Sequence, residues 1–280
     1  MTVLLAVLAG VLGLAVGSFL NVLIWRLPRN ESLSHPASHC PHCDHPIRGY
    51  DNVPLLSWAL LRAKCRDCGA PISVRYPLIE LATGLLFAGV TVWAVLVGPA
   101  TALTGSASAL EVIAAVLALL AYLYLGAISV ALAAIDIELH RLPDRIVLPS
   151  IVVVAALLSA SSLLSGDAWP ILWGAVGSVG LFLLYFVMAV AYPGGMGFGD
   201  VKLAALLGFA LAWLGWAELA VGAFGAFVFG GVFSLILLIA RRAGRRSKIP
   251  FGPWMLAGAF AGIVVGSAVF SGYLRLFGLA

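Results

Sequence analysis

Eight apolar runs, each close to the length of a membrane-spanning helix, dominate this chain of 280 residues. A helix needs about 20 apolar residues to cross a bilayer. With 62% hydrophobic and only 10% charged residues, the composition is that of a polytopic membrane protein. We therefore predict an all-α fold with about eight transmembrane helices. The expected spans are Leu4–Trp25, Pro77–Val97, Val112–Ile135, Ile146–Leu164, Pro170–Tyr192, Val201–Trp216, Leu219–Ala240 and Phe251–Phe270.

The connections between these runs suggest how the chain is divided. The sixth run is the shortest, and because only residues 215–218 separate it from the seventh, we expect the two to form a tight helical hairpin. The first connection is long enough to be a small soluble unit. We predict a first transmembrane helix over residues 1–25, a cytoplasmic loop over 26–76 and a membrane domain of seven helices over 77–280.

Positive charge is concentrated on one side of this topology. Of the 16 lysine and arginine residues, all but Arg275 lie in or beside the segments that follow the first, third, fifth and seventh spans. By the positive-inside rule that side is the cytoplasm, and both termini are outside. The basic residues therefore report membrane orientation, and we expect the lipid bilayer, not nucleic acid, as the surrounding partner.

Four cysteines in the first loop form two Cys-x-x-Cys pairs. They are Cys40, Cys43, Cys65 and Cys68. Two such turns can present four thiolates tetrahedrally to one zinc ion. A cytoplasmic location disfavours the alternative of two disulfides, and no strand-helix pattern supports a redox pair. Because four thiolates leave no open coordination position, we predict a structural zinc site, with His39 and His42 as neighbours that could replace one thiolate.

A glycine-rich segment, residues 191–203, interrupts the apolar sequence between the fifth and sixth runs and leads into Asp200. Such backbone does not stay helical cheaply, and at membrane depth it is tolerated only where protein covers it or where it lines a wet cavity. We predict an active-site loop in which glycine adopts conformations closed to other residues and Lys202 favours the ionised form of a nearby carboxylate. Its glycines are Gly194, Gly195, Gly197 and Gly199, of which the last three are assigned to the active-site loop with Lys202. The alternative is a plain turn between two spans.

A second carboxylate, Asp136, lies at the cytoplasmic end of the third run. A charged side chain costs about 2.5–3.5 kcal/mol at the centre of a membrane helix and less near its end. Pro143 should end this helix, so we assign Glu138 and Arg141 to a solvated turn. Asp144 is the competing candidate for a functional carboxylate here.

The predicted topology brings Asp136 and Asp200 to the same face of the membrane. Two carboxylates that share a proton can act as general base and general acid, and with a water between them they can hydrolyse a peptide bond. No other catalytic set is as good, since Ser18 and Ser129 lack a histidine at a plausible depth. We predict Asp136 and Asp200 as the catalytic pair.

Short motifs follow one another along nearly the whole chain in an order that resembles the type IV prepilin peptidases, a family of membrane aspartic peptidases with a Gly-x-Gly-Asp active site. The matching segments are Gly17 to Val22, Arg26-Leu27-Pro28, the two cysteine pairs, Arg75-Tyr76-Pro77 with Glu80, Asp136, Leu142-Pro143-Asp144, Gly195 to Leu203, and Ile249 to Pro253. The resemblance implies an endopeptidase of the bacterial inner membrane. It would remove the short basic leader of a pilin or pseudopilin precursor at the cytoplasmic face.

The resemblance leaves two points open. Many members carry an acid-x-acid pair where this chain has Asp136-Ile137-Glu138, so catalysis is assigned to Asp136 alone and Glu138 is peripheral. Some members also methylate the new N-terminus with S-adenosylmethionine, an activity that no residue of this chain allows us to derive.

Two rival functions remain. A small transporter or channel with a broken-helix site would explain the glycine-rich segment, but not carboxylates at the cytoplasmic ends of spans. A membrane scaffold would use the cysteine loop and leave both acids idle. The sequence names neither the particular pilin nor the oligomeric state.

Overall fold

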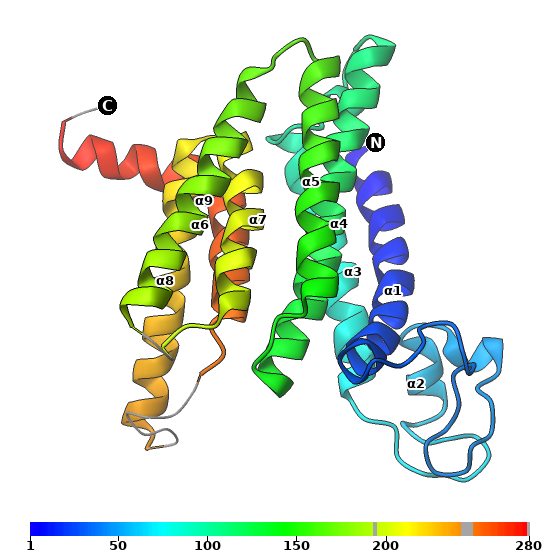
Figure 1. The fold of residues 1–280 in the computed structure, drawn as a ribbon. Coiled ribbons are helices and arrows are strands. Elements are labelled where there is room, and N and C mark those ends of the chain that lie inside the picture. The colour runs from blue at the N-terminus through cyan, green and yellow to red at the C-terminus, as the bar shows by residue number, and fades with distance from the viewer. Residues whose placement is uncertain (193–194, 242–248, 279–280) are drawn as a thin grey trace. The chain divides into compact units, whose positions relative to one another are not determined.

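The computed structural model describes residues 1–192, 195–241 and 249–278. The regular secondary structure of these residues is helical, with two isolated β-bridges and no longer strand. Figure 1 shows the order of the elements. The α-helices are α1 Thr2–Arg26, α2 Leu56–Leu60, α3 Arg75–Leu96, α4 Ala109–Leu139, α5 Asp144–Leu164, α6 Trp169–Ala191, α7 Phe198–Leu214, α8 Trp216–Ile239 and α9 Gly252–Leu276. Short 3-10 helices cover Leu27–Arg29, Gly49–Asn52 and Thr101–Leu103.

Each of the eight predicted spans coincides with one helix, which confirms the all-α fold. By length and composition, seven of the described helices are able to cross a membrane. The remaining helix, α7, matches the sixth predicted span and has 17 residues. The single residue Gly215 separates it from α8, as the predicted hairpin requires. Large apolar side chains are exposed along α1 and α8, including Val7, Leu8, Phe224 and Ile239. Such surfaces suit contact with lipid, and the chain is a multi-pass membrane protein.

The chain forms two compact units. The first contains Met1–Gly105 and Tyr122–Ala131, and the second contains Ser106–Ala121 and Leu132–Ala280. The boundaries predicted at residues 25 and 76 concern which segments lie in the membrane, and they stay a prediction.

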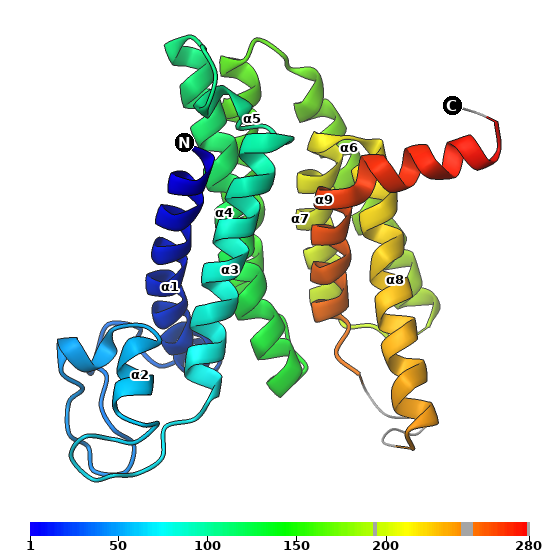
Figure 2. The same ribbon diagram turned by 180° about the vertical axis from the view of Figure 1, so that it is seen from behind.

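In the first unit, α1 packs along α3 (Figure 2). A β-carbon added at Gly17 would lie 2.7 Å from the Cα of Glu80, so the two backbones touch where glycine leaves room. Two polar side chains then bind backbone groups of the loop, one at its end and one near its middle. Asn21 Nδ2 donates to the carbonyl of Tyr76 at 3.2 Å, and Glu80 Oε2 accepts from the N–H of Leu55 at 2.8 Å. The motifs around these residues thus join the loop to the helix pair.

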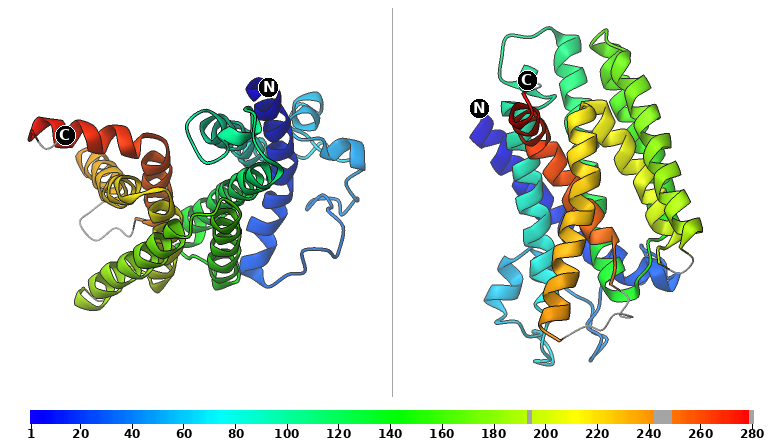
Figure 3. Two further views of the ribbon diagram at one scale, coloured as in Figure 1. Left: turned by 90° about the horizontal axis from the view of Figure 1, so that it is seen from above. Right: turned by 90° about the vertical axis from the view of Figure 1, so that its left-hand side faces the viewer.

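In the second unit, α7 is the central helix. It packs against α5, α6, α8 and α9 (Figure 3), and buried residues run from Asp200 to Ala212 on all of its sides. A helix that is apolar all round belongs in a core, which explains why so short a span is stable. Its closest neighbour is α6, where a β-carbon at Gly208 would lie 2.4 Å from the carbonyl oxygen of Gly177.

Candidate active site

Asp136 lies near the end of α4 and is 5% exposed. The helix ends because His140 adopts a left-handed conformation at φ 52° and Pro143 follows, which cannot continue the helical hydrogen bonding. Asp136 Oδ2 accepts a hydrogen bond of 3.0 Å from the N–H of Gly252, the first residue of α9. A carboxylate at the end of one helix is therefore held by the backbone at the start of another.

Asp200 lies in the first turn of α7 and is 8% exposed. Its Oδ2 accepts from the N–H of Gly197 at 3.1 Å, and its own N–H donates to the carbonyl of Gly197 at 3.1 Å. The side chain thus caps the helix from its third residue, in the manner of a capping box. The first helical turn presents free N–H groups to a carboxylate, so this position fixes Asp200 firmly.

The two acids are brought together in the second unit. Leu142, in the connection between α4 and α5, contacts the residues beside both of them: a β-carbon at Gly199 would lie 2.9 Å from Leu142 Cβ, and one at Gly252 would lie 3.2 Å from Leu142 Cδ2. Two largely buried carboxylates near one another in a membrane protein can share a proton and work as acid and base.

Lys202 pairs with Asp144. Its Nζ lies 2.7 Å from both carboxylate oxygens of Asp144, the first residue of α5, and 5.0 Å from the ring centroid of Phe198. The lysine was predicted to favour the ionised form of a nearby carboxylate, and the carboxylate it meets is Asp144. Glu138 and Arg141 are both exposed. Arg141 follows the helix, whereas Glu138, which was predicted to lie in a solvated turn, belongs to the last turn of α4.

The glycines before Asp200 matter because a side chain at two of them would collide with its neighbours, and less because of an unusual backbone conformation. Gly195 and Gly197 lie in the connection between α6 and α7, whereas Gly199 lies inside α7. Gly197 has φ −78°, and Gly199 has the negative φ of a helical residue. A β-carbon at Gly195 would overlap the ring of Tyr192, and one at Gly199 would press on Leu142. The predicted loop is thus shorter than expected, and Gly194 lies outside the described residues.

Two residues of this site carried no functional assignment in the sequence. The N–H of Gly252 holds Asp136, and a β-carbon there would lie 2.7 Å from Asp136 Oδ2. Leu142 touches both sides of the site. The motifs that contain them, Ile249 to Pro253 and Leu142-Pro143-Asp144, could have pointed to these two residues. Neither glycine nor leucine has a reactive side chain, so the sequence offered no reason to assign them a role.

The four cysteines cluster in the first unit. They are free thiols, and their Sγ atoms all lie within 4.8 Å of one another. The two Cys-x-x-Cys pairs adopt the same kind of turn. The N–H of Cys40 donates to the carbonyl of His45 at 3.0 Å, and the N–H of Cys65 donates to the carbonyl of Ala70 at 2.8 Å. Each turn continues with a left-handed residue, Asp44 and Gly69. A tetrahedral cluster of four sulfurs suits zinc.

The thiols differ in acidity. Backbone N–H groups of His42 and Cys43 lower the pKa of Cys40 to about 6. The N–H of His45 also acts to lower the pKa of Cys43, but desolvation and the neighbouring thiols outweigh it and raise that pKa to about 12. Several thiolates at this spacing repel one another, so a bound cation is what would let all four ionise together.

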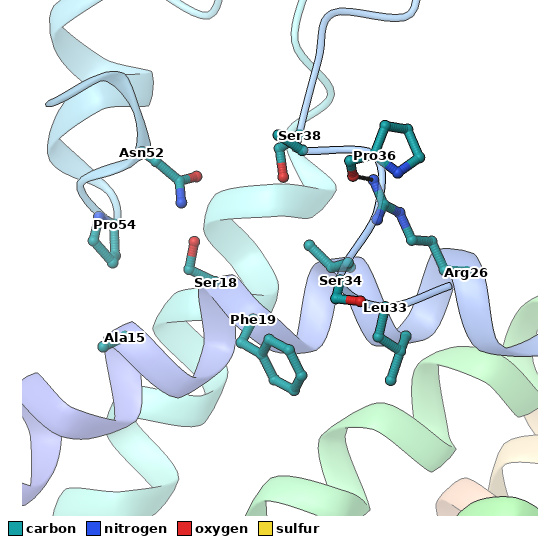
Figure 4. Close-up of a pocket in the computed structure, with 12 residues that line it drawn as sticks. Ala15, Ser18, Phe19, Arg26, Leu33, Ser34, Pro36, Ser38, Asn52 and Pro54 are labelled. Carbon is teal, nitrogen blue, oxygen red and sulfur yellow. Dashed lines mark hydrogen bonds between the residues drawn. The ribbon is translucent and has the colours of Figure 1, made fainter. Parts of the chain in front are cut away.

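A cavity of about 420 Å³ lies in the first unit, between α1 and the loop (Figure 4). Ser18, Ser38 and Asn52 line it with polar groups, and Phe19 adds an aromatic ring. In its wall Arg26, 9% exposed, donates to the carbonyls of Ser32 at 3.0 Å and Pro36 at 2.7 Å. Arg26, which belongs to the Arg26-Leu27-Pro28 segment, thus helps to shape the cavity.

Comparison with known proteins gave consistent results for both units. The family model described as "Bacterial Peptidase A24 N-terminal domain" matches residues 11–94, and the one described as "Type IV leader peptidase family" matches residues 123–239. A protein of Stutzerimonas stutzeri named "Prepilin leader peptidase/N-methyltransferase" is 37% identical, over 95% of this chain and 92% of its own length. Proteins of the same name from Aeromonas hydrophila, 35% identical over 94% and 92%, and Myxococcus xanthus, 39% identical over 88% and 67%, are also similar. No solved structure matches the chain.

Proposed function

The chain belongs to the type IV leader peptidase family, and we propose that it is a prepilin peptidase in which Asp136 and Asp200 cleave the leader. The observation that carries this assignment is the pairing of two buried carboxylates, each held by a backbone N–H, from Gly252 and Gly197. Side chains so fixed are preorganised for acid-base chemistry.

The reaction would proceed by direct attack of water on the scissile peptide. One carboxylate takes a proton from the water as the water oxygen bonds to the carbonyl carbon. The protonated partner hydrogen-bonds to the carbonyl oxygen. Collapse of the tetrahedral intermediate then breaks the C–N bond, and the carboxyl group that took the proton from the water gives it to the departing amine. The N–H groups of Gly197 and Gly252 each bind Oδ2 of their aspartate and so hold the two carboxylates in place for this chemistry.

The substrate would be the basic leader of a pilin or pseudopilin precursor, cut just before its apolar helix. The distribution of lysine and arginine supports a cytoplasmic face for the site, and the bacterial relatives support the inner membrane. A precursor lying as a helix in the bilayer would present its unwound cut site at that interface, where Asp136 ends α4 and Asp200 begins α7.

The helix arrangement weighs against a transporter. Transporter sites use helices that are broken near the bilayer midplane. Here the glycine-rich segment connects two complete helices, α6 and α7, that pack against each other. Asp136 and Asp200 lie at helix ends.

The direct test is cleavage of a purified pilin precursor by the purified full-length protein in detergent or liposomes, with the products identified by mass. We expect one cut at the leader boundary. Intact precursor after incubation with protein whose fold is verified by circular dichroism would overturn the assignment.

The cysteine cluster is proposed to hold one structural zinc ion. Four sulfurs within 4.8 Å of one another match the ligand set of a closed tetrahedral site. Such an ion would fix the two turns and hence the loop, and it would take no part in peptide cleavage.

A second activity, N-methylation, is supported by the relatives' name. We assign the methyl donor, S-adenosylmethionine, to the cavity beside Phe19, since 420 Å³ falls in the range of small-molecule sites. Phe19 would stack on the adenine, and Ser18 and Asn52 would offer hydrogen bonds. The donor supplies an activated methyl group to the new N-terminus.

Calorimetry with S-adenosylhomocysteine tests this site. Ser18→Trp should fill the cavity and weaken binding at least about 10-fold, whereas Leu12→Trp, at an exposed position of α1, should not. Equal binding by both variants, or no binding by the unmodified protein, would remove the methyl donor from this cavity.

A further inference from the structure

We propose that the connection between α4 and α5 is a positioning device for the catalytic pair, in which Leu142 sets the spacing and the Asp144–Lys202 ion pair fastens it. The inference rests on the proposed function, because it assumes that Asp136 and Asp200 carry out the chemistry. It makes Asp144 and Lys202 positioning residues.

Leu142 is placed between the supports of the two acids. On one side it meets Gly199, the residue before Asp200, where a β-carbon would lie 2.9 Å from Leu142 Cβ. On the other side it meets Gly252, the residue whose N–H holds Asp136. One side chain thus separates the first turn of α7 from the first turn of α9, and a change in its volume would alter the spacing of the carboxylates.

The ion pair between Asp144 and Lys202 links the same two segments, α7 and the connection between α4 and α5. Lys202 lies two residues after Asp200 in α7, and Asp144 begins α5 two residues after Leu142. With both oxygens 2.7 Å from Lys202 Nζ, the pair ties the helix that carries Asp200 to the segment that carries Leu142.

The exposure of the pair indicates that its role is geometric. The side chain of Asp144 is 54% exposed and that of Lys202 is 21% exposed. Exposed ion pairs contribute little to folding stability, whereas a displacement of about 1 Å in a catalytic group can cost about 100-fold in rate. The pair should therefore matter much more to turnover than to stability.

Asp144 is thereby distinguished from the catalytic aspartates. Both of its oxygens face an ammonium group, and it lies at the exposed start of α5. A general acid or base must reach the substrate and exchange a proton. Asp144, the competing candidate from the sequence, would instead act through Lys202.

The test measures kcat and KM for precursor cleavage by the full-length enzyme carrying Lys202→Met, Asp144→Asn or the reversed pair Asp144→Lys with Lys202→Asp. We expect each single variant to lower kcat about 10- to 100-fold with KM within about 2-fold and an unchanged unfolding midpoint. The reversed pair should recover most of the loss. Arg145→Met is the matched control, because it removes an exposed positive charge next to Asp144.

The pH profile separates positioning from chemistry. If Asp144 acts only through Lys202, Asp144→Asn lowers the bell-shaped profile of kcat without removing either limb. Loss of a limb, or wild-type kcat in both single variants, would overturn the inference. Asp136→Asn and Asp200→Asn are assayed in parallel: if either cleaves normally, the proposed function fails, whereas if both are inactive and Lys202→Met is normal, only the positioning device fails.

Leu142 gives an independent measurement. Leu142→Ala should lower kcat about 10-fold or more, whereas Leu142→Met, which nearly conserves the volume, should keep most of it. Equal rates for the two variants would show that the side chain does not set the spacing.

Discussion

The cysteine cluster of the first unit and the acid pair of the second are assembled in opposite ways. The cysteines come from two copies of one local turn, closed by bonds such as Cys40 to His45 and Cys65 to Ala70. The acids come from different helices, and the N–H that holds Asp136 belongs to Gly252, 116 residues away. Spacing along the chain is therefore enough to recognise the first site. The second depends on packing between helices.

Removal of a cysteine ligand should have the largest effect of all the substitutions. It should alter the zinc content and the stability of the loop and leave the membrane helices unchanged. Any of the four Cys→Ser variants should lose its zinc and leave the loop open to proteolysis, because metal binding supplies about 10–16 kcal/mol in small zinc modules. Helical circular dichroism should be unchanged. Metal analysis of the unmodified protein should give close to one equivalent of zinc.

His42→Ala is the control, since His42 is exposed beside the cluster. It should keep the zinc. If the histidine variant loses the metal, or if a protein without all four cysteines still binds one equivalent, the cluster is not the self-contained site that its turns indicate.

Gly252→Ala should displace the carboxylate of Asp136 and leave the cysteine cluster unchanged. The added carbon would lie 2.7 Å from Asp136 Oδ2 and 3.2 Å from Leu142 Cδ2, so the carboxylate must move. We expect kcat to fall about 100-fold with zinc content unchanged. Gly231→Ala in α8 has nothing within 4 Å of its new carbon and serves as the control. Equal cleavage by both variants would show that this contact does not position Asp136.

The smallest expected effect concerns the Arg66–Asp51 pair in the loop. Arg66 lies 2.6 Å from Asp51 and lowers the pKa of that carboxyl. A carboxyl group whose pKa is lower in the folded state than in the unfolded state stabilises the folded loop at every pH above its unfolded pKa. This stabilisation is lost only as the pH falls through the folded pKa. The small loss of protease resistance in Asp51→Asn should therefore be constant from about pH 6 to about pH 8. A loss that changes across this window would indicate another titrating partner.

The sequence predicted most of the fold because the fold is a series of apolar runs. All eight spans were confirmed as helices, and α7, the shortest of them, is buried on every side. The cysteines were predicted for the same local reason. The roles of Leu142 and Gly252 were not, because an apolar side chain and a backbone N–H acquire a function only from neighbours far away in the sequence. Lys202 was predicted to favour the ionised form of a nearby carboxylate, and the carboxylate that it contacts is Asp144.

Peptide cleavage by the shared-proton mechanism requires that Asp136 and Asp200 act as one unit. The most direct measurement is the cleavage rate of a pilin precursor by Asp136→Asn, Asp200→Asn and the double variant, with Glu138→Gln as the exposed control. We predict that each single variant loses on the order of 10³-fold or more, that the double variant is no slower than the singles, and that Glu138→Gln cleaves normally. Wild-type cleavage by either single variant, or losses that multiply in the double variant, would contradict the shared mechanism.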